Sequence, residues 1–515
     1  NQSWGVRIAS HRLLDHRNNE VLAAVGSADW RNQSIQGMVN GTRAKRSPGS
    51  TLKPFVYALA LEQGLIHPLS LMRDTPMTFS QYAPDNFQSV FKGPLSATEA
   101  LAQSRNIPAV ELTRDLVDAR RMPGALGSGG DLWELLSRSG VRDLKERDHY
   151  GLSLILGSAE LTMMELAALY AALPNGGVQR PLTLARHPHI TTGREASLVS
   201  SEAAWLALRM LEQNPPTERV RPHTSRGVPV AWKTGTSIGF KDAWSIAVFD
   251  RYVLCVWVGN FSGEGNTSFI GRHIASPLMF RIIDAILAGM DPSQRLPAPA
   301  PPDGVRLVAL CPVSGGLPND HCPRTVEGWF IPGVSPIDRC SIHRVVHVDT
   351  RSGYRSEESR GPYTQTLVRE FWPSDIMALF EQAGLPRLGP PPWPPENLET
   401  LASGRDGFPP RIVTPLSGAV YVLSGGFEDE EEARIVLRAY ADADVRELFW
   451  FADERFLGKV APNETLVWTP EPGPWTLSVV DSRGRSASRS IRVETREEQF
   501  IPGRQRGPGT IQREF

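Results

Sequence analysis

The pattern of apolar and polar positions divides the chain into two parts of different character. In the first 295 residues, apolar positions follow both the helical and the strand period, and this mixture predicts an α/β block. Residues 242–249 and 252–258 are strand-like runs joined by Asp250-Arg251, which predicts an antiparallel hairpin. Thr162-Met163-Met164-Glu165 is a capping-box sequence that should open an apolar helix. Further helices are expected at residues 52–62, 97–104 and 276–288, and further strands at 4–8, 21–25 and 228–232.

The second part carries short alternating runs in place of helices. Between residues 410 and 494 these runs are separated by Gly, Pro and Asp, which predicts a small antiparallel β-sandwich. Two proline-rich stretches, residues 297–302 and 390–395, enclose a loop-rich segment with three cysteines. The expected regions are therefore an α/β domain at 1–295, a linker module at 296–400, a β-sandwich at 401–495 and a flexible polar tail at 496–515.

Composition narrows the classes of function. The chain has 515 residues and a net charge of −1, because Lys and Arg are balanced by Asp and Glu. Without a basic excess or a basic stripe, we expect no nucleic-acid partner. A transmembrane helix needs about 20 consecutive apolar residues, and the best candidate run, residues 252–258, is far shorter.

The strongest chemical signal is Ser50-Thr51-Leu52-Lys53-Pro54. Because proline lacks an N–H group, Pro54 is tolerated only near the first turn of a helix, so a helix should begin near Ser50. The free N–H groups there can stabilise an oxyanion. Lys53 lies one turn above Ser50 and can remove the hydroxyl proton if burial or a nearby cation lowers its pKa. By itself, however, the tetrapeptide is more typical of a capped helix with a solvated lysine.

Two further segments change that balance. Ser104-Arg105-Asn106 lies between an expected helix and a break at Pro108, and it offers a hydroxyl to relay a proton and an amide to hold a substrate backbone. A polar helix end is the simpler interpretation. Lys233-Thr234-Gly235-Thr236-Ser237 follows an expected strand, where Lys233 would keep Lys53 neutral and Gly235 would let a substrate peptide lie close. A plain turn is the alternative there. Together and in this order, the three segments favour a serine acyl-transfer site.

These segments resemble the signature of the serine penicillin-binding proteins and β-lactamases. Their surroundings, including Tyr170-Ala171-Ala172-Leu173-Pro174-Asn175-Gly176-Gly177, are similar to the transpeptidase domain of class A penicillin-binding proteins. Phe330-Ile331-Pro332-Gly333-Val334-Ser335-Pro336-Ile337-Asp338 resembles the 1C subgroup, which ends in an immunoglobulin-like domain. The resemblance implies an α/β (α+β) penicillin-binding/β-lactamase-like fold, with an antiparallel sheet flanked by helices, and an immunoglobulin-like sandwich at 401–495.

The resemblance also implies a D,D-transpeptidase mechanism on peptidoglycan stem peptides, with no cofactor needed for catalysis. Ser50 would be the nucleophile and Lys53 its base, while Ser104 and Lys233 would pass a proton to the leaving D-Ala. The substrate would be held by the remaining side chains and backbone of the three segments, namely Asn106, Thr234, Gly235 and Thr236. β-Lactams mimic the donor peptide and would acylate Ser50.

Other consequences follow from the same resemblance. Members of this family carry a membrane anchor and a glycosyltransferase domain that this sequence lacks, so we expect no glycan polymerisation from this chain. Its place would be the periplasmic side of the bacterial inner membrane, with a protein partner for the C-terminal domain. Arg105 stands where β-lactamases usually have Asp, which favours a transpeptidase. A D,D-carboxypeptidase or β-lactamase and a non-catalytic penicillin-binding sensor or scaffold are the alternative functions.

Three of the four cysteines gather in the loop-rich segment. Together with His343, a set formed by Cys311, Cys322 and Cys340 would make a closed tetrahedral zinc site. One disulfide with a spare thiol is the rival interpretation, and it suits a periplasmic protein; three free thiols are the remaining alternative. With either zinc or a disulfide, the role would be structural. Cys255 lies within an expected strand and should be a core residue.

Overall fold

The computed structural model divides the chain into two compact units, one ending at His343 and the other beginning at Arg344. This division falls inside the linker module expected at 296–400. The residues that the structure describes are 8–75, 91–121, 130–184, 187–192, 194–215, 227–336, 338–357, 359–374, 376–377, 380, 385, 387–392, 394, 407–416, 418–423, 434–462 and 464–495.

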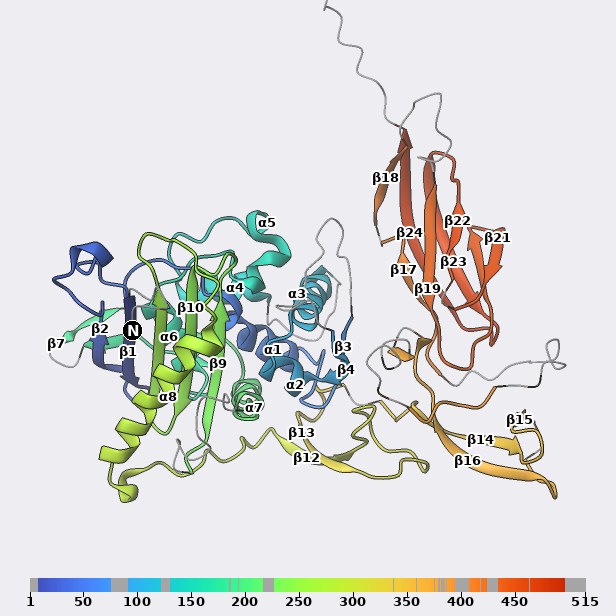
Figure 1. The fold of residues 1–515 in the computed structure, drawn as a ribbon, viewed down its shortest axis with the longest axis horizontal. Helices are drawn as coiled ribbons and strands as arrows, with labels where there is room; N and C mark the ends of the chain where they lie inside the picture. The colour runs from blue at the N-terminus through green and yellow to red at the C-terminus, as the bar shows by residue number, and fades with distance from the viewer. Residues whose placement is uncertain are drawn as a thin grey trace, which may run out of the picture. The chain divides into compact units, whose positions relative to one another are not determined.

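A seven-stranded sheet forms the centre of the first unit (Figure 1), and β9 lies at one edge of it. The strands run in the order β7 (His187–Thr192), β6 (Leu182–Leu184), β2 (Glu20–Val25), β1 (Ile8–Asp15), β11 (Tyr252–Gly259), β10 (Asp242–Phe249) and β9 (Val230–Thr236). All of β10 and nearly all of β11 are buried, which explains why both read as continuous apolar runs.

Helices pack around this sheet. They are α1 (Lys53–Glu62), α2 (Ala97–Ala102), α3 (Asn106–Arg121), α4 (Leu132–Ser139), α5 (Arg147–Tyr150), α6 (Met163–Ala172), α7 (Ser201–Glu212) and α8 (Gly271–Gly289), with short 3-10 turns η1 (Gln33–Ile35), η2 (Gly49–Leu52), η3 (Gly151–Leu156) and η4 (Pro292–Gln294). Helix α8 crosses one face of the sheet in Figure 1, and its Met279, Phe280 and Ile283 share a buried cluster with Trp232 and Leu254. Among the described residues, no helix combines the length and the apolar character needed to cross a bilayer.

A small two-stranded module closes the first unit. Strands β12 (Arg306–Leu310) and β13 (Val326–Phe330) form it, and two other small sheets pair β3 (Leu71–Asp74) with β4 (Gly93–Ser96) and β5 (Val178–Gln179) with β8 (Ala196–Ser197). The module is attached to the helical body, because the rings of Trp329 and Trp205 lie 5.1 Å apart and edge to face. A Cβ on Gly315 would lie 2.1 Å from the Leu69 carbonyl oxygen, so the two backbones are in direct contact.

The second unit combines a three-stranded sheet with a β-sandwich. The three-stranded sheet is built from β15 (Arg355–Ser356), β14 (His343–Asp349) and β16 (Thr364–Glu370). One sandwich sheet holds β17 (Arg411–Thr414), β19 (Ile435–Tyr440) and β22 (Leu466–Trp468), and the other holds β18 (Val420–Leu423), β24 (Ser486–Thr495), β23 (Gly473–Asp481), β20 (Leu448–Ala452) and β21 (Arg455–Val460). The sandwich core includes Trp450 and Trp468, both buried.

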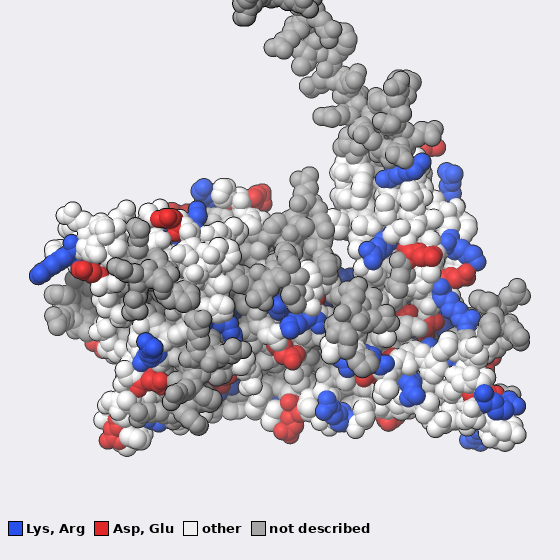
Figure 2. All heavy atoms as spheres, viewed as in Figure 1, with Lys and Arg blue, Asp and Glu red and all other residues white. Residues whose placement is uncertain are grey.

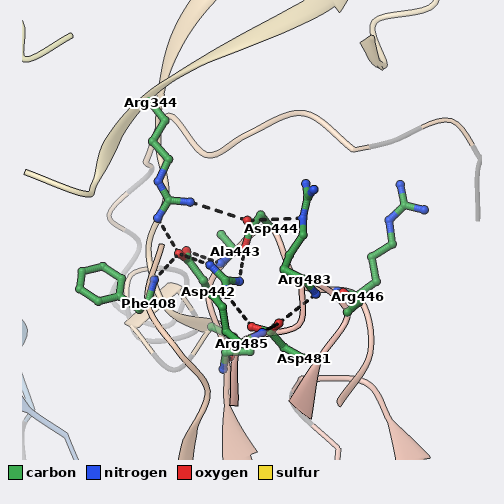
Figure 3. A network of polar contacts seen from close by, with 12 residues as sticks. Arg344, Phe408, Asp442, Ala443, Asp444, Arg446, Asp481, Arg483 and Arg485 are labelled. Carbon is green, nitrogen blue, oxygen red and sulfur yellow. Dashed lines mark hydrogen bonds and ion pairs between the residues drawn. The ribbon is translucent and has the colours of Figure 1, made fainter. Parts of the chain in front are cut away.

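Buried charges join the three-stranded sheet to the sandwich (Figure 3). Arg344 on β14 pairs with Asp442 at 2.5 Å, and Arg485 contacts Asp444 and Asp481 at 2.7 Å each. We call Arg344, Asp442, Asp444, Asp481, Arg483 and Arg485 the Arg–Asp cluster. Elsewhere, on the face in Figure 2, cationic and anionic side chains of the described residues are interspersed.

Several expected elements are confirmed. β10 and β11 form the antiparallel hairpin, with Phe249 opposite Tyr252. Thr162 caps α6 in a complete capping box with Glu165. The strand expected at 4–8 falls almost entirely outside the described residues, and β1 is described from Ile8 onward.

Two expectations are wrong. Pro108 does not break a helix; it lies in the first turn of α3, where a residue without an N–H group costs no hydrogen bond. The sheets are also not purely antiparallel, because β2 runs parallel to β6 and β18 runs parallel to β24. The two strands of each parallel pair are far apart in sequence. No hairpin turn joins them, so the sequence gives no local indication of their relative direction.

Candidate active site

The chain places Ser50 in the tight turn that leads into α1. Ser50 lies in η2, and the Lys53 N–H group donates to the Ser50 carbonyl oxygen in the i to i+3 manner of a 3-10 turn. Side chains three residues apart are eclipsed in such a turn, so Lys53 stands above Ser50. Gly49 begins the turn at φ +52°, a conformation that favours glycine. The expected helix start is confirmed, with the refinement that its first turn is 3-10.

Side chains from distant parts of the chain fix this turn. The Tyr170 hydroxyl donates to the Thr51 carbonyl oxygen at 2.7 Å, and burial raises the pKa of Tyr170 well above its usual range, so the phenol keeps its proton. Trp244 Nε1 donates to the Ser47 carbonyl oxygen at 2.9 Å. The Ser47 hydroxyl in turn donates to the Gly157 carbonyl oxygen at 2.7 Å. The sequence analysis did not predict these hydrogen bonds, although Tyr170 is the first residue of the motif at 170–177 that it identified.

Ser104 and Arg105, between α2 and α3, and Asn106, the first residue of α3, face Lys53. Lys53 Nζ donates to the carbonyl oxygens of Ser104 at 2.7 Å and Arg105 at 3.0 Å, and to Asn106 Oδ1 at 2.6 Å. Ser104 has φ +59°, a strained value for a residue other than glycine. This backbone turn aims the Ser104 carbonyl at one lysine and its hydroxyl at another.

That second lysine is Lys233, which comes from β9. Its Nζ donates to Ser104 Oγ at 2.6 Å and to the Thr234 carbonyl oxygen at 2.9 Å. These hydrogen bonds connect Lys53, Ser104, Asn106 and Lys233, four of the five residues predicted to form the active site, and Ser104 forms hydrogen bonds with both lysines.

The electrostatic surroundings favour neutral amines. Burial, with Lys233 and Arg105 nearby, holds the pKa of Lys53 well below its usual range, while Asp74 acts in the opposite direction. Burial and the Arg272 cation lower the pKa of Lys233 to about 7. The three acceptors around Lys53 suit an ammonium, whereas burial disfavours one. The lowered pKa favours the neutral amine, which is the form of Lys53 that could accept a proton.

Arg105 has a second contact that the sequence did not indicate. Its guanidinium pairs with the fully buried Asp74 at 2.7 Å, and Asp74 also accepts a hydrogen bond from the Lys92 backbone. The pair ties the loop that carries Ser104 to β3. It also sets one positive and one negative charge close to Lys53.

A cleft of about 400 Å³ lies over these groups. The predicted site residues that line it are Ser50, Ser104, Asn106, Thr234 and Thr236. Ile238 and Phe240 add apolar surface, and Arg272 and His273 at the start of α8 add polar groups. The cleft thus joins Ser50, Ser104 and the edge strand β9.

Gly235 has a different reason to be glycine from the one expected. A Cβ at this position would lie 2.3 Å from the Pro48 carbonyl oxygen and 2.8 Å from Thr51 Cγ2. Gly235 therefore lets β9 pack against the turn that carries Ser50, and its role beside a substrate stays a prediction.

The cysteines separate into two groups. Cys255 is fully buried in β11, and burial raises its pKa to about 12, which confirms it as a core residue. Cys311, Cys322, Cys340 and His343 gather in the two-stranded module, apart from the cleft lining, with their ligand atoms within 4.8 Å of one another.

Comparison with known proteins identifies the family. A family model of the penicillin-binding protein transpeptidase domain matches residues 10–278, more than half of the chain. The chain belongs to the penicillin-binding protein transpeptidase family. A model of the C-terminal domain of penicillin-binding protein 1A matches residues 301–345, and one of the penicillin-binding protein C-terminus family matches residues 400–493.

Individual penicillin-binding proteins support this assignment. Penicillin-binding protein 1C of Escherichia coli is 36% identical over 509 residues, which cover 95% of this chain and 62% of that protein. This similarity confirms the resemblance to the 1C subgroup. Penicillin-binding protein 1B of Vibrio cholerae is 29% identical over 263 residues, 48% of this chain and 32% of that protein.

A solved structure shows the same fold. Penicillin-binding protein 1A of Haemophilus influenzae matches with a TM-score of 0.51 at 20% identity, over 65% of this chain and 55% of that one. The expected fold class, a penicillin-binding transpeptidase domain followed by a β-sandwich, is confirmed. The chain spans only part of these relatives.

Proposed function

We propose that this chain is a peptidoglycan D,D-transpeptidase that crosslinks stem peptides through an acyl-enzyme on Ser50. The observation that carries the proposal is the convergence of Lys53 and Lys233 on Ser104, in a cleft also lined by Ser50. The relatives support peptidoglycan synthesis as the setting. This activity belongs on the periplasmic side of the inner membrane, where stem peptides are crosslinked.

Acylation begins when neutral Lys53 takes the Ser50 hydroxyl proton. The Ser50 oxygen then bonds to the penultimate D-Ala carbonyl carbon of the donor stem. Negative charge developing on the carbonyl oxygen would be stabilised by the backbone N–H groups of Ser50 and Thr236. In support, a Cβ on Gly49 would lie 2.9 Å from the Thr236 nitrogen, so the two backbone segments are in contact.

The leaving group needs a proton as the carbon–nitrogen bond breaks. Ser104 would give its hydroxyl proton to the departing D-Ala amine and regain one from Lys233, which already donates to Ser104 Oγ. In the second half of the reaction an amine of another stem attacks the acyl carbonyl. Its proton returns to Lys233 through Ser104, and Lys53 returns the first proton to Ser50.

The donor peptide would lie along β9, which is an edge strand of the described sheet. Thr234 and Thr236 would bind its terminal carboxylate, and Asn106 would hold its backbone. A β-lactam would enter in the same way and acylate Ser50, with the ring nitrogen as the leaving group. The role of the C-terminal domain in binding a protein partner stays a prediction.

The test is acylation by benzylpenicillin, followed by intact mass and peptide mapping. We expect one adduct, located on Ser50 and lost in Ser50→Ala. Ser237→Ala is the matched control, because Ser237 also lines the cleft while its hydroxyl accepts backbone hydrogen bonds from Lys241 and Asp242. Labelling of Ser50→Ala at another serine would overturn the proposal.

A second measurement separates crosslinking from hydrolysis. The chain is given a stem pentapeptide together with a D-amino acid as acceptor amine. A transpeptidase releases D-Ala and forms the new amide, whereas a carboxypeptidase releases D-Ala and forms only the shortened acid. A sensor would take up penicillin but release no D-Ala.

A further inference from the structure

The cysteine cluster is built from three separate segments around the two-stranded module. Cys311 directly follows β12, Cys322 lies in the loop before β13, Cys340 lies three residues before β14, and His343 is the first residue of β14. Cys311, Cys340 and His343 are buried, while Cys322 is partly exposed. Four side chains from these positions meet with all ligand atoms within 4.8 Å of one another.

The spacing between these atoms matches a metal site. The sulfurs of Cys311 and Cys340 each lie 3.5 Å from His343 Nδ1. In a tetrahedral zinc site, with Zn–S about 2.3 Å and Zn–N about 2.0–2.1 Å, a sulfur and a nitrogen ligand lie about 3.5 Å apart. A disulfide would need two sulfurs about 2.05 Å apart, whereas all four cysteines of the chain are free.

We propose that Cys311, Cys322, Cys340 and His343 bind one structural zinc ion, with His343 as an Nδ1 ligand. Three thiolates and one imidazole fill the four positions of a tetrahedral zinc ion, so no position remains open for substrate. The site is therefore structural and independent of the acyl-transfer chemistry.

Asn319 organises the ligands around this centre. Its side-chain amide donates to the carbonyl oxygens of Cys340 at 2.7 Å and His343 at 2.8 Å, and its backbone N–H donates to Cys322 Sγ at 3.4 Å. One residue thus holds three of the four ligands in place. Such outer contacts orient metal ligands before the ion arrives.

The apolar core of the two-stranded module is too small to stabilise it without a further interaction. Strands β12 and β13 each bury only one residue, Leu310 and Gly328, and the other buried aliphatic side chains around them are few: Val305, Ile331 and Ile342. A segment of this size cannot fold on such a core alone. Zinc binding would stabilise the fold of the module. It would thereby also maintain the contacts of the module with Trp205 and Leu69 of the transpeptidase domain.

The test measures metal content and thiol state in the full chain. By elemental mass spectrometry we expect about one zinc per chain. Cys322→Ser and Cys340→Ser should lose it, and Cys255→Ala, a buried cysteine outside the cluster, should keep it. Penicillin labelling of Ser50 in every variant reports that the transpeptidase body is folded.

Cobalt substitution of the unmutated chain gives a readout that needs no variant. Bound Co²⁺ should show thiolate charge-transfer bands and the visible absorption of a tetrahedral site. A chain without zinc, lower in mass by two hydrogens and with two cysteines resistant to alkylation, would establish the disulfide instead. A zinc content unaffected by both serine variants would equally overturn the proposal.

Discussion

The protonation state of Lys53 depends on charges that can be removed one at a time. Arg105 and Lys233 lower its pKa, and Asp74 raises it. Acylation requires the neutral amine, so the rate should fall on the acid side of the pH profile as Lys53 gains a proton. The position of that acid limb therefore reports the pKa of Lys53 in the free enzyme.

Arg105→Gln and Asp74→Asn should move the acid limb in opposite directions. Removing the Arg105 cation raises the pKa of Lys53, so the limb shifts to higher pH; removing the Asp74 charge lowers it, and the limb shifts to lower pH. The measurement is the second-order rate constant for benzylpenicillin acylation across pH. Merely structural damage would lower the rate at every pH without moving the limb, and two shifts of the same sign would contradict the assignment of Lys53 as base.

Sequence reasoning could find the candidate catalytic residues but not the residues that position them. Ser50, Lys53, Ser104, Asn106 and Lys233 stand in short motifs whose spacing carries the chemistry. Asp74, Tyr170 and Trp244 act through contacts across 31, 119 and 197 residues of chain. Such contacts exist only after folding, and a lone Asp or Trp has no local pattern to mark it.

At the scale of elements, the site depends on close packing between η2 and β9. A Cβ at Gly235 would clash with the Pro48 carbonyl oxygen at 2.3 Å, and backbone atoms cannot yield as a flexible side chain can. The strand is held in register with β10 from Val230 to Thr236. The 3-10 turn must therefore move, and it would carry Ser50 away from its partners.

Gly235→Ala should slow acylation at least about tenfold, the effect of about 1.4 kcal/mol at the transition state. Gly289→Ala is the control, since a Cβ there meets no atom within 4 Å. Acylation kinetics and thermal unfolding of both variants provide the measurement. An unchanged acylation rate in a folded Gly235→Ala chain would show that the contact between η2 and β9 does not position the nucleophile.

Local sequence patterns predicted where helices and strands form better than they predicted which strands pair. The capping box before α6 and the hairpin of β10 and β11 are local and were predictable. Strands β18 and β21 carry weaker local signals: β18 pairs with the distant β24, and no residue of β21 is buried, so its apolar positions do not mark an inner face.

At the scale of the whole molecule, the two units should respond separately to damage. The transpeptidase fold and all the residues predicted to be catalytic lie in the unit that ends at His343. The second unit depends on the Arg–Asp cluster, because Arg485 contacts Asp442, Asp444 and Asp481, all of them buried (Figure 3). Removing one partner of a buried ion pair costs about 3–5 kcal/mol, since the charges left behind have lost their compensation.

Arg485→Ala should therefore destabilise the second unit and leave the first intact. Hydrogen-exchange mass spectrometry of the full chain should show faster exchange in β20 and β23 and unchanged protection in β10 and β11, with benzylpenicillin still acylating Ser50. Lys459→Ala is the matched control, because its 2.8 Å pair with Glu447 is exposed and worth at most about 1 kcal/mol. If β10 and β11 lost protection together with the sandwich, the two units would fold as one; if Arg485→Ala matched the control, the cluster would not stabilise the second unit.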